Sequence, residues 1–226
     1  PVEDWQPAFE AAGFKNAIIC KNAPTEKEDP TWDPEDSRYS VIRWAPIPIE
    51  NAMGPHVHDP RSGEILSAHI IVWHDILRLN EQWYFSQVGP LDKRAQKFPF
   101  PLELTGELLR YVVCHEVGHT LGLRHNHKAS SSFTVAQLRN KAFTEKWGDE
   151  ASIMDYGRFN YVAQPGDNVR LIPKLGPYDL FAIEWGYKPI LSARTPDDEK
   201  STLNDIAIRQ VTNPTVRFGS RESTGG

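Results

Sequence analysis

Three histidines and a glycine between residues 115 and 125 have the spacing of a metal site. The segment reads H-E-x-x-H-x-x-G-x-x-H, with His115, His119 and His125 at the histidine positions. On a helix, the first two lie one turn apart on the same face, so both imidazoles can reach one ion. Gly122 suits the left-handed turn that would end the helix and return His125 as a third ligand. Three protein ligands leave one position of a tetrahedral zinc ion open for water, which is typical of a catalytic site.

The glutamate of the motif is suited to a different role. Glu116 follows His115 and is rotated by about 100° around the helix axis, which keeps it near the ion without ligating it. Zinc lowers the pKa of a bound water, and a nearby carboxylate can take the proton and later deliver it to a leaving amine. The motif therefore predicts one catalytic zinc ion with Glu116 as the general base.

Together with a second segment, this motif resembles the metzincin clan of zinc endopeptidases. The second segment, Ser152–Tyr156 (S-I-M-D-Y), is similar to the Met-turn, the other hallmark of that clan. Residues 176–183 resemble the start of the last catalytic-domain helix in bacterial metzincins. In detail, residues 115–126 and 152–161 resemble a bacterial group of zinc-dependent metalloproteases. The resemblance covers most of the chain and is weakest at both ends.

The resemblance also gives roles to residues outside the zinc motif. Met154 is too weak a ligand for the first coordination sphere, and its flexible thioether is expected to form a packed floor beneath the histidines. Tyr156 resembles a tyrosine of astacin-like and serralysin-like enzymes whose phenol approaches the zinc or the reacting carbonyl oxygen, which implies a catalytic role in stabilising the oxyanion. The alternative is a core tyrosine. Asn126, directly after the third histidine, departs from the Glu, Asp, Ser or Pro of the familiar subfamilies.

The predicted function is zinc-dependent hydrolysis of peptide bonds in a protein or peptide substrate, as an endopeptidase. One alternative is a zinc-containing module that binds peptides without cutting them, although such a module would have no use for Glu116. Another is a non-peptide amidase or deacetylase that uses the same zinc chemistry.

The remaining histidines allow further interpretations. His56 and His58 could hold a second, structural metal beside the sheet, as in some metzincin subfamilies, or could simply be solvated loop residues. His127 is expected to act as a neighbour of the ligands rather than as a ligand. Of the two cysteines, Cys114 is expected to be a packed small hydrophobic residue, and their number leaves the redox compartment open.

Composition sets the broad class of the protein. With 226 residues, 39% of them hydrophobic and 24% charged, the chain is expected to form one globular domain. A net charge of −5 without a basic cluster gives no reason to expect a nucleic-acid partner. No apolar run approaches the roughly 20 residues of a membrane span. The resemblance alone implies an extracytoplasmic location, with any targeting segment outside this sequence.

The expected fold is α+β, a metzincin-like zincin catalytic domain. It would have a mixed twisted sheet and two long helices above an active-site cleft, in an upper subdomain (residues 1–122) that carries the zinc helix. A lower, irregular and helical subdomain (residues 123–226) would carry the Met-turn and the C-terminal helices. Prolines in and around residues 49–57 suit the edge of a sheet, where metzincins bind an extended peptide beside the metal.

Local patterns predict the individual elements. The zinc helix is expected to be capped by Thr105. A capping box at Thr134 predicts a helix to about residue 143. Other helices are expected at residues 5–12, 75–86, 178–185 and 196–210. Strands are expected at residues 16–20, 39–45 and 64–73, and a frayed tail from Phe218 onward.

Overall fold

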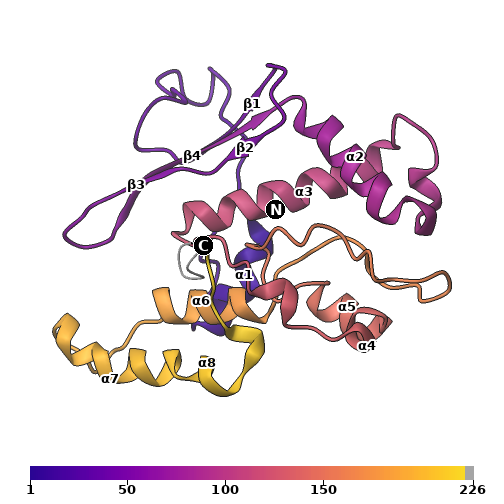
Figure 1. Ribbon diagram of the computed structural model, residues 1–226. Coiled ribbons are helices and arrows are strands. Elements are labelled where there is room, and N and C mark those ends of the chain that lie inside the picture. Colours follow the sequence, from indigo (N-terminus) through magenta and orange to yellow (C-terminus); the bar gives the residue numbers. More distant parts are fainter. Residues whose placement is uncertain (222–226) are drawn as a thin grey trace.

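One long strand, β4 (Ile65–Trp73), organises the sheet of this α+β protein (Figure 1), whose computed structural model describes residues 1–221. β1 (Val41–Ala45) pairs with β4 in parallel. The short strands β2 (Ala52–Met53) and β3 (His56–His58) both pair with β4 in antiparallel orientation. β2 lies on the side of β4 opposite β1. The predicted mixed sheet is therefore confirmed, and the segment that precedes β4 forms an edge as its prolines indicated.

The helices of the protein differ greatly in length. Those in α conformation are α1 (Gln6–Ala11), α2 (Ile76–Val88), α3 (Leu102–Thr120), α4 (Val135–Leu138), α5 (Lys141–Trp147), α6 (Pro177–Tyr187), α7 (Pro196–Ala207) and α8 (Arg209–Thr212). Single 3₁₀ turns are η1 (Glu3–Trp5), η2 (Gly89–Leu91), η3 (Lys93–Ala95), η4 (Ala129–Ser131) and η5 (Pro214–Val216). In the part of the chain that the structure describes, no helix is both long and apolar enough to cross a lipid bilayer.

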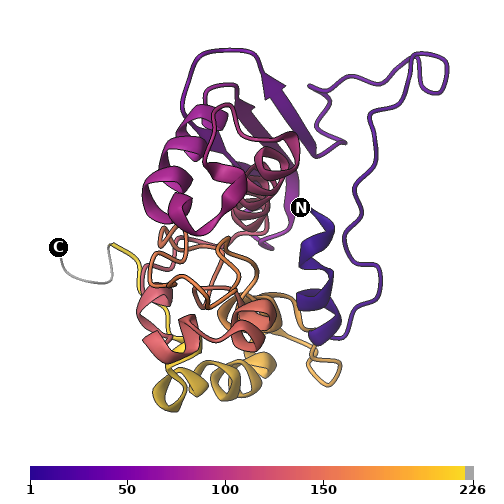
Figure 2. The same cartoon turned by 90° about the vertical axis from the view of Figure 1, so that its right-hand side faces the viewer.

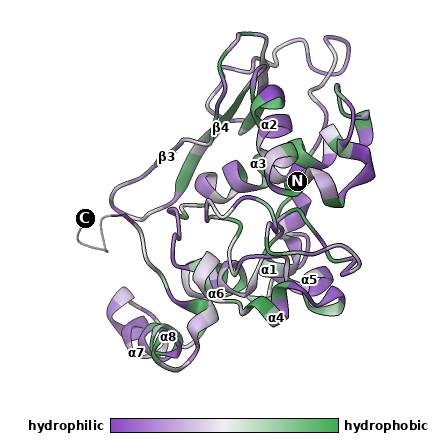
Figure 3. Cartoon of the chain, turned by 45° about the vertical axis from the view of Figure 1, so that its right-hand side comes forward, coloured by the Kyte–Doolittle hydropathy of each residue, from purple (hydrophilic) through white to green (hydrophobic). Residues whose placement is uncertain are grey.

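The sheet positions α3 through one face of β4. Alternate residues of β4, namely Ala68, Ile70 and Val72, are buried, as expected for a strand with one covered face. Figure 3 shows much of β4 in the hydrophobic colour. α3 contacts β4 and β2 on that side, and its own buried residues include Leu108 and Val112. The two apolar surfaces thereby hold the helix that carries the zinc motif against the sheet.

The lower half of the molecule is built from short helices, and α1 joins it from the other end of the chain. α1 packs against α6, with Phe9 and Tyr187 in edge-to-face contact at 5.2 Å between ring centroids. The indole N–H of Trp5 donates to the Cys114 carbonyl in α3 (3.1 Å). The chain after α1 then runs up the side of the molecule to the sheet (Figure 2). A division into subdomains at Gly122 stays a prediction. The N-terminal segment with α1 contacts both sides of this division, namely α3 before Gly122 and α6 after it.

Two predictions about the first half of the chain are wrong. Residues 16–20 form no strand, since they pair with no other strand and are largely exposed. Thr105 does not cap α3, which begins three residues earlier at Leu102 after Pro101 in extended conformation. The backbone N–H of Thr105 instead donates to the Pro101 carbonyl inside the first turn. Proline has no N–H to lose and so fits the start of a helix.

The second half also departs from prediction in part. The capping box of Thr134 and Gln137 is confirmed, but its helix ends at Leu138 because Asn140 caps the new helix α5. The predicted last helix is interrupted at Ile208, between α7 and α8. The tail is not frayed at Phe218, whose N–H donates to the Gln210 side chain. Only residues 222–226 of the predicted tail lie outside the described residues.

Candidate metal centre

The three histidines of the motif come together at the C-terminal end of α3. His115 and His119 lie on the helix, and His125 follows in the loop. Gly122 has φ of 90° and so takes the left-handed conformation that was predicted for it. The N–H of Leu123 then donates to the Gly118 carbonyl (3.1 Å), which closes the helix and turns the chain back.

The ligand atoms converge as one metal ion requires. The Nε2 atom of His125 lies 3.3 Å from that of His115 and 3.1 Å from that of His119. Two nitrogens bound at 2.0–2.1 Å to a tetrahedral zinc ion would be about 3.3–3.4 Å apart. Within residues 1–221, this is the one group of three or more potential ligands close enough to share an ion. Its donor set therefore fits zinc.

Hydrogen bonds orient two of the imidazoles. Nδ1 of His115 lies 2.7 Å from the Ile153 carbonyl, and Nδ1 of His119 lies 2.9 Å from the Leu123 carbonyl. When Nδ1–H donates to these oxygens, the lone pair of each Nε2 faces the centre of the cluster. Burial lowers the pKa of His115 to about 3, and burial together with the neighbouring histidines lowers that of His125 to about 4. The imidazoles are thus neutral, which is the form that binds metal.

Glu116 is buried beside the cluster and contacts the edge of the sheet. Burial raises the pKa of its carboxyl to about 7, although the nearby backbone N–H of Gly54 partly offsets this. Gly54, between β2 and β3, comes so close to the helix that a Cβ atom there would lie 2.2 Å from the Glu116 carbonyl oxygen. Sequence reasoning missed Gly54, although a glycine in an expected edge strand is a signal of close backbone approach.

Met154 packs against α3, which carries two of the three histidines. It is completely buried, and its sulfur packs against Gly118, between the two helical histidines. The Met154 carbonyl accepts a hydrogen bond from the Asn126 N–H (3.0 Å), directly after the third histidine. This buried hydrogen bond joins the turn at Met154 to the histidine loop next to the cluster.

The Asn126 side chain also has a structural role, which could not be inferred from its difference from the familiar subfamilies. Its Nδ2 donates to the Arg217 carbonyl (3.0 Å), and its Oδ1 accepts from the Gly219 N–H (2.9 Å). The side chain thereby fastens the C-terminal segment to the histidine loop. An aspartate could not donate, so the amide is the side chain that these two contacts require.

Tyr156 lies beside the histidine cluster rather than in the core. Its ring centroid is 4.3 Å from that of His125 and 5.4 Å from that of His115, and 46% of the residue is exposed. A core position, the alternative for this tyrosine, is therefore wrong. His127 is a further neighbour, with its ring 5.5 Å from His125 and its Nδ1 3.6 Å from Asp155.

His56 and His58 lie together on β3, with ring centroids 5.4 Å apart. Nδ1 of His56 lies 3.0 Å from the His119 carbonyl, which connects the edge strand to the end of α3. In the described part of the chain, the pair has no third potential ligand within reach of a shared ion. The structure therefore gives no support to a second metal ion at His56 and His58. His56 instead contacts the C-terminal end of α3.

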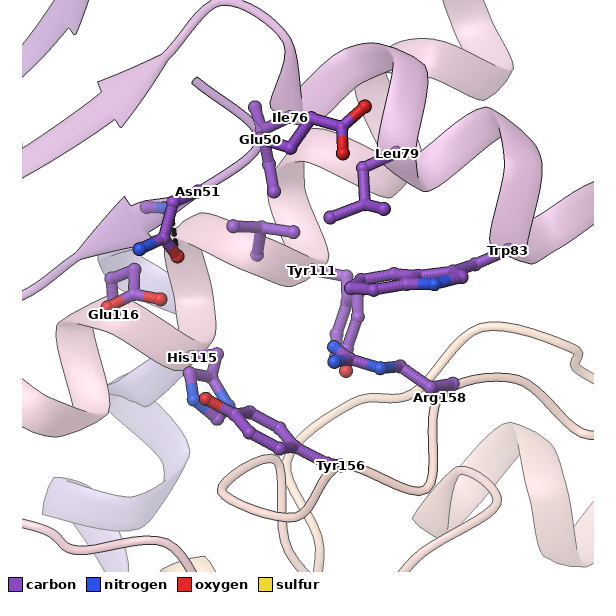
Figure 4. Close-up of a pocket in the computed structure, with 12 residues that line it drawn as sticks. Glu50, Asn51, Ile76, Leu79, Trp83, Tyr111, His115, Glu116, Tyr156 and Arg158 are labelled. Atoms are coloured by element: carbon purple, nitrogen blue, oxygen red, sulfur yellow. Dashed lines mark hydrogen bonds between the residues drawn. The ribbon is translucent and has the colours of Figure 1, made fainter.

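A cavity opens next to Glu116 and His115 (Figure 4). Its volume of about 80 Å³ is several times what one water molecule needs. Its walls combine aliphatic and aromatic side chains with polar groups at opposite ends. The remaining lining residues are Glu50, Asn51, Ala52, Ile76, Leu79, Trp83, Tyr111, Val112, Tyr156 and Arg158.

The comparison with known families agrees with this geometry. A family described as Met-zincin matches residues 97–226, which include α3, the histidine cluster and the turn at Met154. The match covers more than half of the chain, so the protein belongs to the Met-zincin family. Neither the curated proteins nor the solved structures that were compared give a match.

Proposed function

We propose that this protein is a zinc-dependent endopeptidase that hydrolyses peptide bonds of protein or peptide substrates. The observation that carries the proposal is the convergence of three imidazoles beside a buried glutamate, with Nε2 of His125 at 3.3 and 3.1 Å from those of His115 and His119. Membership of the Met-zincin family supports the same class of chemistry. A zinc ion held by His115, His119 and His125 would supply an acidified water and polarise the scissile carbonyl.

The residues around the cluster have groups suited to the other steps. Glu116 would take the proton of the attacking water and deliver it to the leaving amine. The Tyr156 hydroxyl would donate to the oxyanion that forms on the carbonyl carbon. The edge segment at Gly54, which contacts the helix backbone at Glu116, would bind the substrate in extended form.

Metal analysis tests the ligand assignment. The purified protein should contain one zinc ion per chain. His119→Ala should lose this ion, because the two histidines that remain are too few to hold it. His74→Ala is the control, since this histidine is exposed and outside the cluster. Stoichiometric zinc in the His119 variant would contradict the assignment.

Replacing the general base tests the reaction. Glu116→Gln should keep zinc and fold but lose about 10²–10⁴-fold in peptide hydrolysis, because an amide cannot accept the proton. Glu103→Gln, at an exposed position of the same helix, should keep full activity. Zinc-loaded protein that cleaves no member of a broad peptide pool would refute the endopeptidase proposal. Binding of those peptides would then favour the binding module, and hydrolysis of small amides the amidase.

A further inference from the structure

Arg158 holds a positive charge at one end of the cavity beside Glu116. Its guanidinium carbon lies 3.7 Å from the ring centroid of Trp83 and 4.6 Å from that of Tyr156. Two aromatic rings thus hold the planar group in place, which lowers the entropy lost when it binds a ligand. The residue is only partly buried, and Figure 4 shows its guanidinium directed toward the cavity, beside the hydroxyl of Tyr111.

This cation lacks the carboxylate partner that several other arginines of the protein have. Among residues 1–221, no carboxylate forms an ion pair with Arg158, whereas Arg78, Arg94 and Arg110 each have one. The other carboxylate at the cavity wall, Glu50, is already paired with Arg78 at 2.6 Å. A guanidinium has five N–H donors in a planar fork that matches a carboxylate. One contact of Arg158 goes to the Tyr111 hydroxyl, and its remaining donors are available to a ligand in the cavity.

The backbone at this position indicates that the tertiary structure specifies the placement of Arg158. Its φ of 70° lies in the left-handed region, which is uncommon for a residue other than glycine, asparagine or aspartate. Tyr156, beside the histidines, is two residues earlier in the same loop. The loop that carries the Met-turn thus brings the phenol and the guanidinium to the same side of the cluster.

We propose that Arg158 binds a carboxylate of the substrate residue that follows the scissile bond, an inference that rests on the proposed peptidase function. Glu116 would deliver its proton to the leaving amine, so the residue that carries this amine lies on the Glu116 side of the metal. Its side chain would then enter the cavity that begins at Glu116, with Ile76, Leu79 and Val112 along the wall and Arg158 at the end. The carboxylate could belong to an aspartate or glutamate side chain, or to a free C-terminus.

Matched peptides test the proposal. Peptides that differ only by glutamate or glutamine after the scissile bond isolate the charge of that side chain. In each peptide the scissile bond lies before the last residue. Each peptide is also compared as a free acid and as a C-terminal amide, which isolates the charge of the C-terminus. The native protein should prefer the carboxylate by about 10–100-fold in kcat/KM, which corresponds to a charge-assisted hydrogen bond. Preference for glutamate identifies a side-chain ligand, and preference for the free acid identifies the C-terminus. Either result supports a carboxylate site.

Variants assign that preference to the guanidinium. Arg158→Gln should reduce the ratio of the two kcat/KM values to about 1, and Arg158→Lys should restore part of it. Arg158→Glu should reverse the preference toward lysine at the same position, a gain that misfolding could not produce. Arg139→Gln is the control, because Arg139 pairs with Asp167 and does not line the cavity.

Two results would overturn the inference while the proposed function stands. These are equal cleavage of both peptides of each pair by the native protein, or an unchanged ratio in Arg158→Gln. Absence of all cleavage would count against the peptidase function instead. In that case the same peptide pairs are titrated calorimetrically into Glu116→Gln, and a Kd ratio near 1 would overturn the carboxylate site independently of catalysis.

Discussion

The sulfur atom of Met154 occupies the space where a side chain on Gly118 would begin. A Cβ atom on Gly118 would lie 2.2 Å from the Met154 sulfur and 2.9 Å from the Trp5 ring, and both of these residues are completely buried. Gly118 lies in α3 between the two helical histidines. The turn at Met154 can therefore approach α3 only because this one position has no side chain.

Gly118→Ala should consequently destabilise the protein. Overpacking a buried contact costs about 1–3 kcal/mol, which outweighs the roughly 1 kcal/mol that alanine gains in helix propensity. We expect a fall of a few degrees in Tm, measured by calorimetry, and weaker metal retention. Gly106→Ala in the same helix is the control, because its Cβ would enter open space and should stabilise. A stabilised Gly118 variant would show that Met154 and Trp5 can move aside.

Tyr156→Phe tests the proposed donor beside the cluster. If the hydroxyl stabilises the oxyanion, its loss should lower kcat and kcat/KM alike by about 10²–10³-fold, with KM little changed. Zinc content should not fall, since three histidines remain. The matched control is Tyr161→Phe, at a position that is 66% exposed. A Tyr156 variant with full activity would remove the residue from the mechanism.

Asn126→Asp should loosen the C-terminal segment. The variant loses the donor to the Arg217 carbonyl and places a charge at a completely buried position. Leaving a buried group unsatisfied costs about 1–3 kcal/mol, and more when it is charged. The expected result is a lower Tm and faster proteolysis after residue 213. Asn22→Asp, at an exposed position, should change neither quantity.

Asp179 predicts a specific dependence of stability on pH. Burial raises its pKa to about 7 from an ordinary 3.8, against hydrogen bonds from Ser152 and two backbone N–H groups that lower it. A raised carboxyl pKa stabilises the fold below the unfolded-state value, and this contribution is lost as pH rises from about 4 through 7.

The neutral variant Asp179→Asn isolates this contribution. Between pH 5 and pH 8, the unfolding free energy of the native protein should fall by about 1–3 kcal/mol relative to the variant. Denaturant titrations at both pH values measure the difference. Asp205→Asn, at an exposed position, should show no such change. Parallel pH profiles for Asp179→Asn and the native protein would disprove the shift.

Much of the candidate site was predictable because its geometry is local. Helix periodicity alone requires His115 and His119 to share a face, and Gly122 supplies the turn to His125, with φ of 90° in the structure. The alternating pattern of β4 and the capping box at Thr134 were predictable for the same reason. Each of these features depends on residues within a few positions of one another.

Errors arose where local preference competed with another local or long-range term. Residues 16–20 have the composition of a strand but no strand beside them to pair with. Thr105 is a good capping residue, yet the chain is already helical three residues earlier, where Pro101 sets the start of α3. The helix from Thr134 ends early because Asn140 offers a second cap. In each case the residues around the segment decide whether its local preference for a helix or strand is realised.

The sequence by itself determined the spacing of the three histidines, the helix that carries two of them, the α+β class and the family resemblance. Only the tertiary structure decided that Gly54 approaches the backbone at Glu116 and that Asn126 fastens the C-terminal segment. It also decided that Arg158 lies between two aromatic rings next to the cluster. Apart from the contact between Arg158 and Tyr156, these contacts join residues far apart along the chain. Packing and desolvation bring such residues together without leaving a periodic trace in the sequence.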